Sequence, residues 1–243
     1  MLNVKTMIKD AIILAGGLGT RLRAAVPDLP KCMAPVLAKP FIGYLFDYLL
    51  QEGIEKFIIS LGYKANVIEQ YLQTQYGGCN ITYTVEEEPL GTGGAVKLAC
   101  KRASEKTVLV LNGDTFFKID PRKLASFHDM CGADCTLSLK PMRNFNRYGL
   151  VELNKDYSIN SFKEKQYYEE GLINGGVYAL HSEKFLREDL PDKFSFEKDY
   201  LQKFTGSRKF YGVIQDEYFI DIGIPEDYER AQTELILNIP NNA

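Results

Sequence analysis

The sequence predicts an α/β fold with a mostly parallel mixed sheet flanked by helices, and three observations lead to this prediction. Short apolar runs alternate with helix-length segments through the first half of the chain. The first apolar run, at residues 10–15, ends in glycines, as a buried parallel strand does. No change in composition, linker or internal repeat divides the 243 residues. Strands that alternate with such helices form right-handed βαβ units, so we expect a single Rossmann-like sheet.

In the first half, the expected strands and helices alternate regularly. The strand at 10–15 is followed by residues 41–50, which are helix-length and apolar on most sides, and Gly53 ends that helix. The elements that follow, in order, are a strand at 56–61, a helix through 67–72, a strand at 81–85, a helix at 95–103 and a strand at 107–111.

After about residue 133 the pattern changes to further strands with short helices. A last helix is expected to begin at Pro225, because proline suits the first turn and the following Glu226 and Asp227 favour the positive helix end. The other expected elements are strands at 135–139, 149–153 and 175–180, with short helices near 182–188 and 196–204.

Composition excludes several classes of function. The 29 Lys and Arg residues against 32 Asp and Glu give a net charge of −3, which provides no basic field for nucleic acid. No apolar run approaches the roughly 20 residues that span a membrane, and the start lacks the apolar region of a signal peptide. Five cysteines with only His128 and His181 provide no zinc set at the usual spacing. We therefore expect a cytoplasmic protein with reduced cysteines and no nucleic-acid or membrane partner.

A glycine-rich stretch at residues 14–22 directly follows the first strand. Glycines there let the backbone approach a ligand and point successive N–H groups at an anion. The stretch is not a Walker A motif, because no Gly-Lys-Ser/Thr follows, and Leu22 stands where G-x-G-x-x-G needs its third glycine. By itself it could be a tight turn. Arg21 and Lys31, however, add two cations suited to a polyphosphate.

With these residues the chain resembles the sugar-1-phosphate nucleotidyltransferases, most of all the short guanylyltransferases that act on mannose- or heptose-1-phosphate. The resemblance implies the GT-A type nucleotidyltransferase fold in one domain at 8–238. Its nucleotide-binding half would span about 8–132 and its sugar-phosphate-binding half about 133–238. Further matches follow in the family's order at 86–94, 112–114, 147–149, 162–165, 173–176 and 219–223.

The family reaction explains which groups the site needs. A sugar phosphate oxygen, already ionised, attacks the α-phosphorus of a nucleoside triphosphate, and pyrophosphate leaves, so no general base is required. Asp114 and Asp221 each follow an apolar strand and are expected at the same sheet edge, where they would bind Mg²⁺. An aspartate after a strand is more often only a turn or helix-cap residue, but both positions match the family.

The resemblance assigns a catalytic role to three cations. Arg21 would clamp the triphosphate, Lys31 would lie near the transferred phosphate, and Lys165 would hold the sugar phosphate. The residues expected to bind the nucleotide are Leu14, Ala15, Gly16, Gly17, Glu86, Gly91 and Asn112.

Glu86 indicates the base. Related thymidylyl- and uridylyltransferases commonly have glutamine three places before the proline that is here Pro89. A carboxylate only accepts hydrogen bonds, which suits the N1–H and N2 amino groups of guanine and repels the carbonyls of uracil. GTP is therefore favoured, although the run 86–88 leaves open which glutamate reads the base. Gly91 would let the backbone approach the base or ribose.

The second half is expected to bind the sugar. Glu164 and Asn174 can hydrogen-bond hydroxyls, and the glycines would leave room for a ring. The charged stretch at 196–199 is interpreted as a helix surface and is left out. The residues matching the family's sugar-phosphate pocket are Gly149, Glu164, Lys165, Asn174 and Gly175.

The prediction is an Mg²⁺-dependent enzyme that makes a GDP-sugar, with D-glycero-D-manno-heptose 1-phosphate as the first choice of acceptor. The alternatives are a uridylyltransferase for a sugar such as N-acetylmuramate 1-phosphate, a mannose-1-phosphate guanylyltransferase, and a silent regulatory paralogue that only binds nucleotide-sugar. The six residues after position 237 leave no room for a hexapeptide β-helix, so a bifunctional acetyltransferase is not expected. The identity of the sugar 1-phosphate and the oligomeric state, including a possible homo-oligomer, stay open.

Overall fold

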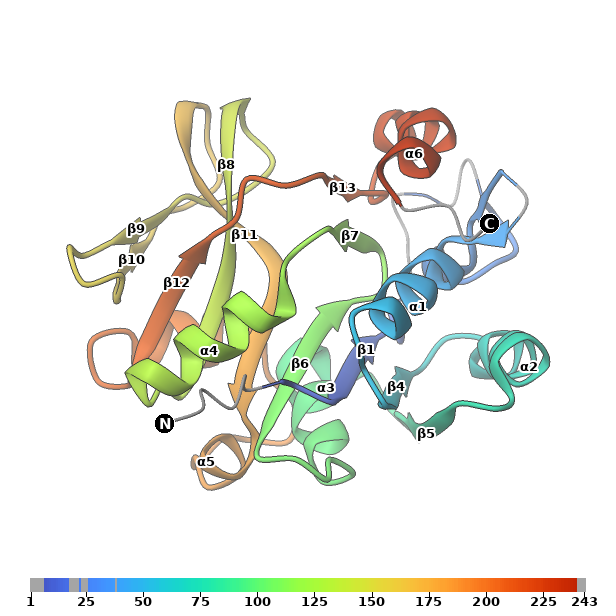
Figure 1. The fold of residues 1–243 in the computed structure, drawn as a ribbon, viewed down its shortest axis with the longest axis horizontal. Coiled ribbons are helices and arrows are strands. Elements are labelled where there is room, and N and C mark those ends of the chain that lie inside the picture. Colours follow the sequence, from blue (N-terminus) through green and yellow to red (C-terminus); the bar gives the residue numbers. More distant parts are fainter. Residues whose placement is uncertain (1–6, 18–21, 23–25, 38, 240–243) are drawn as a thin grey trace, which may run out of the picture.

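The computed structural model describes residues 7–17, 22, 26–37 and 39–239. Its centre is a seven-stranded sheet in the order β12-β8-β11-β6-β1-β4-β5 (Figure 1). Four neighbouring pairs in it are parallel, and β11 is antiparallel to both β6 and β8. The predicted α/β fold with a mostly parallel mixed sheet is therefore confirmed. The strands of this sheet are β1 (Asp10–Leu14), β4 (Lys56–Leu61), β5 (Asn80–Val85), β6 (Thr107–Asn112), β8 (Cys135–Phe145), β11 (Tyr168–His181) and β12 (Phe210–Ile214).

Three short two-stranded ribbons and six α-helices surround the sheet. The ribbons pair β2 (Pro35–Val36) with β3 (Lys39–Pro40), β7 (Thr115–Phe117) with β13 (Phe219–Asp221), and β9 (Val151–Leu153) with β10 (Ile159–Phe162). The helices are α1 (Phe41–Gln51), α2 (Ala65–Tyr76), α3 (Gly91–Cys100), α4 (Pro121–Cys131), α5 (Ser182–Leu186) and α6 (Pro225–Asn238), with a 3₁₀ turn at Lys31–Met33 and a π-helix at Phe196–Gln202.

Helices cover both faces of the sheet, which explains the continuous apolar runs of its strands. Ala11 and Ile13 of β1 pack on the side of α1, α2, α4 and α6, in one buried cluster. Ile12 points to the other face and joins a second cluster with residues of α3, α5 and the π-helix. Alternate residues of one strand thus feed two cores, as the twofold period of a strand requires.

The predicted boundaries differ most from the structure at α3, in the β8 and β11 arm, and at β9. The helix expected at 95–103 is α3, which begins four residues earlier at Gly91 and ends at Cys100. The strands expected at 135–139 and 175–180 are the buried ends of β8 and β11, which continue outward as a two-stranded arm. The strand expected at 149–153 includes only residues 151–153. The outer arm lacks the buried apolar pattern by which its inner part was predicted.

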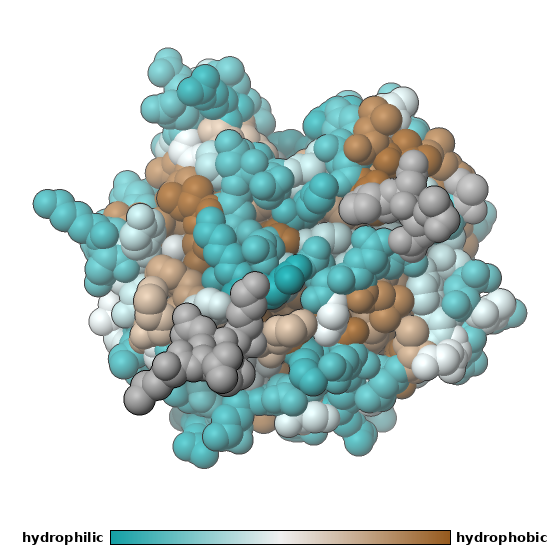
Figure 2. All heavy atoms as spheres, viewed as in Figure 1, coloured by the Kyte–Doolittle hydropathy of each residue, from teal (hydrophilic) through white to brown (hydrophobic). Residues whose placement is uncertain are grey.

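The molecular surface is mainly polar on the face drawn in Figure 2, with a brown apolar area over α6. Ile236 and Leu237 of α6 are 45% and 82% exposed. Among the helices of the described residues, none has the length and apolar character that crossing a membrane requires.

Candidate active site

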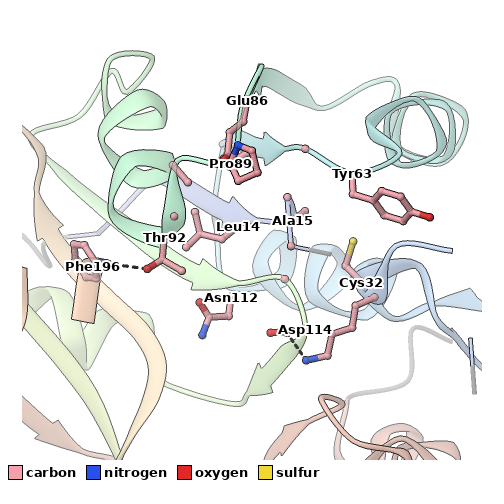
Figure 3. Close-up of a pocket in the computed structure, with 18 of the residues that line it drawn as sticks. Leu14, Ala15, Cys32, Tyr63, Glu86, Pro89, Thr92, Asn112, Asp114 and Phe196 are labelled. Atoms are coloured by element: carbon pink, nitrogen blue, oxygen red, sulfur yellow. Dashed lines mark hydrogen bonds and ion pairs between the residues drawn. The ribbon is translucent and has the colours of Figure 1, made fainter. Parts of the chain in front are cut away.

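A pocket of about 760 Å³ opens where β1, β4 and β6 end (Figure 3). Such crevices outside the carboxyl ends of parallel strands are the usual ligand sites of α/β sheets. The pocket includes all seven residues predicted for the nucleotide and two of those predicted for catalysis or metal. The predicted residues that line it are Leu14, Ala15, Gly16, Gly17, Lys31, Glu86, Gly91, Asn112 and Asp114.

The first part of the glycine-rich stretch lies against the end of β4. The Ala15 N–H donates to the Ser60 carbonyl at 2.8 Å. A side chain at Gly62 would place its Cβ 2.8 Å from the Gly16 carbonyl oxygen, so these two segments approach as closely as glycine allows. At Gly17 no atom of the described residues lies within 4 Å of an added Cβ, and Gly17 lines the pocket. Arg21 lies outside the described residues.

Glu86 is the member of the glutamate run that forms part of the pocket wall. It is half-buried, and its Oε2 accepts a hydrogen bond from the Leu90 N–H at 2.8 Å. Its Oε1 lies beside Gly16, 3.0 Å from the position of an added Cβ. Glu87 also lines the pocket but is exposed, and Glu88 is exposed without lining it. The geometry therefore favours Glu86 over its neighbours as the group that faces a base.

Gly91 is needed for its backbone conformation as well as for the pocket. Its φ is +71°, and an added Cβ would lie 2.6 Å from the Phe194 carbonyl oxygen. Next to it, the Gly93 N–H donates to that same carbonyl at 2.9 Å. Glycines at the start of α3 therefore let the segment before the π-helix pack directly on this helix.

Two carboxylates from distant parts of the chain meet at one end of the pocket. Asp221 pairs with Thr115 in the ribbon of β7 and β13, and this pairing brings it beside Asp114. The Lys31 Nζ lies between them, 2.5 Å from Asp114 Oδ2 and 3.4 Å from Asp221 Oδ1. The Gly223 N–H donates to Asp221 Oδ1 at 2.8 Å and orients it. The structure thus joins three of the predicted residues in one ion-pair cluster.

This donor set fits a hard divalent cation that also binds substrate. Both carboxylates already face the same positive charge, the Lys31 ammonium. Within the described part of the chain no group of three or more His, Cys, Asp or Glu side chains is placed to hold a metal, so the protein alone provides no complete cage. Mg²⁺ suits such a site, because it usually takes one or two carboxylates and completes its shell with phosphates and water.

Cys32 also lines this end of the pocket, next to Lys31. Burial, with the Asp114 carboxylate as the second cause, raises the pKa of the Cys32 thiol to about 12. The thiol stays protonated at neutral pH, so it is not a candidate nucleophile.

Arg147 is a further cation that the motif analysis did not single out. Its Nη2 lies 3.6 Å from Asp221 Oδ2, and its Nη1 donates to Asp227 at the start of α6. Arg230 donates to the other oxygen of Asp227 at 2.7 Å. Arg147 therefore connects the loop after β8 with the carboxylate cluster and with α6.

The residues predicted for the sugar do not line the pocket. An added Cβ at Gly175 would lie 2.4 Å from Phe117 Cδ1, and one at Gly149 would lie 2.6 Å from the Lys163 carbonyl oxygen. Glu164 and Lys165 are exposed in the segment between β10 and β11. At both glycines, neighbouring protein atoms therefore occupy the space that a side chain would take, so each glycine permits close packing at that point.

Asn174 does not line the pocket itself, but it contacts two residues that do. Its Nδ2 donates to the Tyr178 hydroxyl at 2.8 Å and to Glu197 Oε1 at 3.2 Å, and its Oδ1 accepts from the Gly176 N–H at 3.1 Å. Tyr178 and Glu197 themselves line the pocket. The Asn174 amide therefore orients the two side chains that border the pocket.

Part of the stretch at 196–199, interpreted from sequence as a helix surface, lies in the pocket wall. Ser195, Phe196 and Glu197 line the pocket, and the Phe196 N–H donates to Thr92 Oγ1 at 3.0 Å, a contact visible in Figure 3. These residues begin a π-helix, a form that is rare and frequent at functional sites. The charged stretch is visible in the sequence, but charged residues at a helix start are usually solvated, so the pattern alone does not indicate a pocket.

Comparisons with known proteins show which family and which enzymes this chain is similar to. The model of a family described as nucleotidyl transferase matches residues 10–237. A D-glycero-α-D-manno-heptose 1-phosphate guanylyltransferase of Aneurinibacillus thermoaerophilus is 53% identical over 226 residues, which cover 93% of this chain and 98% of that one. The enzyme of the same name from Campylobacter jejuni is 46% identical, with 90% and 96% covered.

A solved structure extends the likeness to three dimensions. The crystal structure of HddC from Yersinia pseudotuberculosis, complexed with GMP-PN, matches with a TM-score of 0.84 at 39% sequence identity. The match covers 94% of this chain and all of the other.

Proposed function

Because the chain belongs to the nucleotidyl transferase family, we propose that it transfers a guanylyl group from GTP to D-glycero-D-manno-heptose 1-phosphate, giving GDP-heptose and pyrophosphate. The observation that carries this proposal is the similarity to heptose 1-phosphate guanylyltransferases along nearly the whole length of both chains. The pocket at the ends of β1 and β6 supports it, since a glycine-rich turn, fixed cations and a carboxylate pair are what this reaction uses.

The proposed chemistry needs charge neutralisation more than proton transfer. The phosphate oxygen of the heptose 1-phosphate attacks the α-phosphorus of GTP while the bond to pyrophosphate breaks, and the attacking oxygen is already ionised. The main cost is bringing two anions together in line. Arg21, Lys31 and Lys165 would supply the positive charge, with Arg21 and Lys31 on the triphosphate and Lys165 on the sugar phosphate. Backbone N–H groups of Gly16 and Gly17 would donate to phosphate oxygens.

We assign Asp114 and Asp221 to an Mg²⁺ ion, which when bound supplies positive charge to the phosphate oxygens and lowers the cost of charge build-up there. The contribution of the protein is to hold the two carboxylates at one place. The pairing of β7 with β13 and the hydrogen bond from the Gly223 N–H to Asp221 do so.

Glu86 would select guanine. Its carboxylate would accept from the N1–H and N2 amino groups of the base, and it offers no donor to the carbonyls of uracil. Gly91 and the neighbouring Pro89, which also line this end of the pocket, would border the base and ribose.

The acceptor sugar would be bound on the side of β11 and the π-helix. Glu197 and Tyr178 present polar groups to the pocket and are oriented by Asn174. We assign Glu197 to sugar hydroxyls together with Asn174, Glu164, Gly149 and Gly175, the residues suggested by the family resemblance.

A single assay tests the proposed reaction and its metal site. GTP and D-glycero-D-manno-heptose 1-phosphate are incubated with Mg²⁺, pyrophosphate is measured, and GDP-heptose is identified by mass. We expect turnover that stops when a chelator removes Mg²⁺. Asp114→Ala and Asp221→Ala should each abolish turnover while circular dichroism shows an intact fold, because no other group replaces the metal charge.

Asp216→Ala is the matched control, since Asp216 is an ion-paired aspartate whose side chain is 74% exposed and lies outside this pocket. No pyrophosphate release from this substrate pair would contradict the proposed function. Folded Asp114 and Asp221 variants with near-normal rates would rule out the metal site.

A further inference from the structure

Lys31 occupies the position between the two carboxylates that a metal ion would take. Its side chain is only 12% exposed, and its ammonium contacts Asp114 Oδ2 and Asp221 Oδ1 at once. Figure 3 shows the contact with Asp114 as a dashed line from the 3₁₀ turn that carries Lys31. The Lys31 ammonium therefore contacts both carboxylates within the pocket wall.

The surroundings hold the ammonium in that position. Lys31 begins the turn Lys31–Met33, whose next two residues are buried, so the backbone is anchored in the core. On the other side, a Cβ added to Gly223 would lie 2.9 Å from the Lys31 Nζ and 2.8 Å from Asp221 Oδ1. A side chain at this position would therefore press on both the ammonium and the carboxylate, and glycine leaves the space in which they meet.

A divalent cation at these carboxylates would compete with the ammonium for the same negative charge. The Lys31 Nζ already contacts Asp114 Oδ2 and Asp221 Oδ1, and two positive charges at such short distances would repel each other strongly. The guanidinium of Arg147, 3.6 Å from the other oxygen of Asp221, would add to that repulsion. With Lys31 in this position, binding of a metal would therefore be disfavoured.

We propose that Lys31 is a cation placeholder, which holds Asp114 and Asp221 together in the nucleotide-free enzyme, keeps a divalent cation from binding tightly, and is released to the incoming phosphates. This inference rests on the proposed metal site and adds an order of events to it. A triphosphate offers Lys31 new anionic partners, so the lysine exchanges a carboxylate contact for a phosphate contact when the metal arrives with the nucleotide. Without Lys31 the two carboxylates would repel each other and bind a metal more readily.

The test is the affinity of nucleotide-free protein for Mn²⁺, measured by electron paramagnetic resonance of the free ion. Lys31→Met keeps the aliphatic length and removes the charge. We expect Mn²⁺ to bind this variant at least roughly tenfold more tightly than the unmodified protein, from the loss of one adjacent positive charge. Lys31→Gln should show the same gain, and it serves as the second variant where the first is poorly folded.

Lys140→Met is the matched control. Lys140 forms an ion pair with Asp216 at the same 2.5 Å distance, and its side chain is 18% exposed, but it lies outside the pocket. This change alters the net charge equally and should leave Mn²⁺ affinity unchanged. Thermal unfolding gives an independent measure, because Mn²⁺ should raise the melting temperature of the Lys31 variants and not that of the control.

The outcomes separate this inference from the proposed function. Equal or weaker Mn²⁺ binding by both Lys31 variants, with the unmodified enzyme active on GTP, would overturn the placeholder role and leave the function standing. The double variant Lys31→Met, Asp114→Asn tests where the metal binds. If it still binds Mn²⁺ more tightly than the unmodified protein, the metal binds elsewhere, which contradicts both the placeholder role and the proposed metal site. If the tighter Mn²⁺ binding is lost in the double variant, both are supported.

Discussion

At the scale of single residues, Glu86 uses its two carboxylate oxygens differently. Oε2 accepts from the Leu90 N–H and fixes the turn before α3, while Oε1 lies beside Gly16 in the pocket wall. Glu86→Gln keeps one oxygen for Leu90 but turns an amide donor toward the donors of guanine. A charge-assisted hydrogen bond contributes about 1.5–3 kcal/mol, so discrimination for GTP over UTP should fall at least roughly tenfold in kcat/KM.

Glu87→Gln and Glu88→Gln are the controls for this experiment, because both side chains are exposed whereas Glu86 is half-buried in the pocket wall. They should keep the base preference of the unmodified enzyme. If all three variants keep it, the assignment of Glu86 to guanine is wrong.

Lys165 is the residue whose predicted role depends most on the family resemblance, because it is exposed and lies outside the pocket wall. Lys165→Met should raise KM for the sugar phosphate and slow kcat, since the ammonium would otherwise neutralise the acceptor phosphate. Affinity for GTP, measured by calorimetry, should be largely kept. Lys163→Met, which removes a neighbouring exposed lysine paired with Glu152 at 3.3 Å, provides the comparison. Lost GTP affinity with unchanged acceptor KM would place Lys165 on the other substrate.

At the scale of elements, α4 packs on the sheet through a buried imidazole. His128 is 2% exposed, and its Nδ1 lies 2.9 Å from Thr136 Oγ1 of β8. Burial lowers the pKa of His128 to about 4, and burial also lowers the pKa of the nearby His181. The folded protein thus disfavours the protonated imidazoles, whereas the unfolded chain takes up protons near pH 6.5.

The stability of the fold should therefore decrease with acidification. The contribution of His128 is intact above about pH 6.5 and is lost as the pH falls from there toward 4, amounting to about 2 kcal/mol by pH 5. Urea unfolding at pH 7.5, 6 and 5 measures this loss. His128→Gln should remove most of the slope over that range, whatever its effect on stability at pH 7.5. An unchanged slope in this variant would assign the acid sensitivity to other groups.

The elements also show where sequence patterns were sufficient and where they were not. Buried strands such as β1 and β6 were predicted because a short, continuous apolar run between turn residues is typical of a strand buried on both faces. The start of α3 was missed, since Gly91, Gly93 and Gly94 disfavour a helix by themselves and are used there for close contact with residues 192–194. Packing between segments far apart in the chain decided that boundary.

In the candidate site, too, some residues could be predicted from the sequence and others could not. Glu86 and Asp114 follow β5 and β6, and the edge where parallel strands end is predictable from the strands themselves. Asp221 is instead the last residue of β13, whose antiparallel pairing with β7 brings it to the same place. The contact of Lys31 with both carboxylates and the place of Glu197 in the pocket wall depend on tertiary structure. The sugar glycines Gly149 and Gly175 were matched by motif alone, and the structure shows that protein atoms fill the space beside them.

At the scale of the whole molecule, one sheet carries both ends of the pocket. β1, β4 and β6 end at the part that we propose for the nucleotide, while β11, antiparallel to β6, brings Tyr178 to the same pocket. The π-helix that contributes Glu197 is tied to α3 through the hydrogen bond between Phe196 and Thr92. Base selection and sugar selection are therefore expected to be properties of one continuous cavity.

Competition between substrates tests this account most directly. Equal concentrations of the four nucleoside triphosphates are mixed with equal concentrations of D-glycero-D-manno-heptose 1-phosphate, mannose 1-phosphate and N-acetylmuramate 1-phosphate, with Mg²⁺, and early products are quantified by mass spectrometry. Product ratios in such a mixture equal ratios of kcat/KM, because all substrates compete for the same free enzyme. We predict GDP-heptose as the main product, in roughly tenfold or greater excess over any other nucleotide-sugar. A UDP-sugar as the main product would contradict the assignment of guanine to Glu86, and GDP-mannose in excess would contradict the assignment of the heptose.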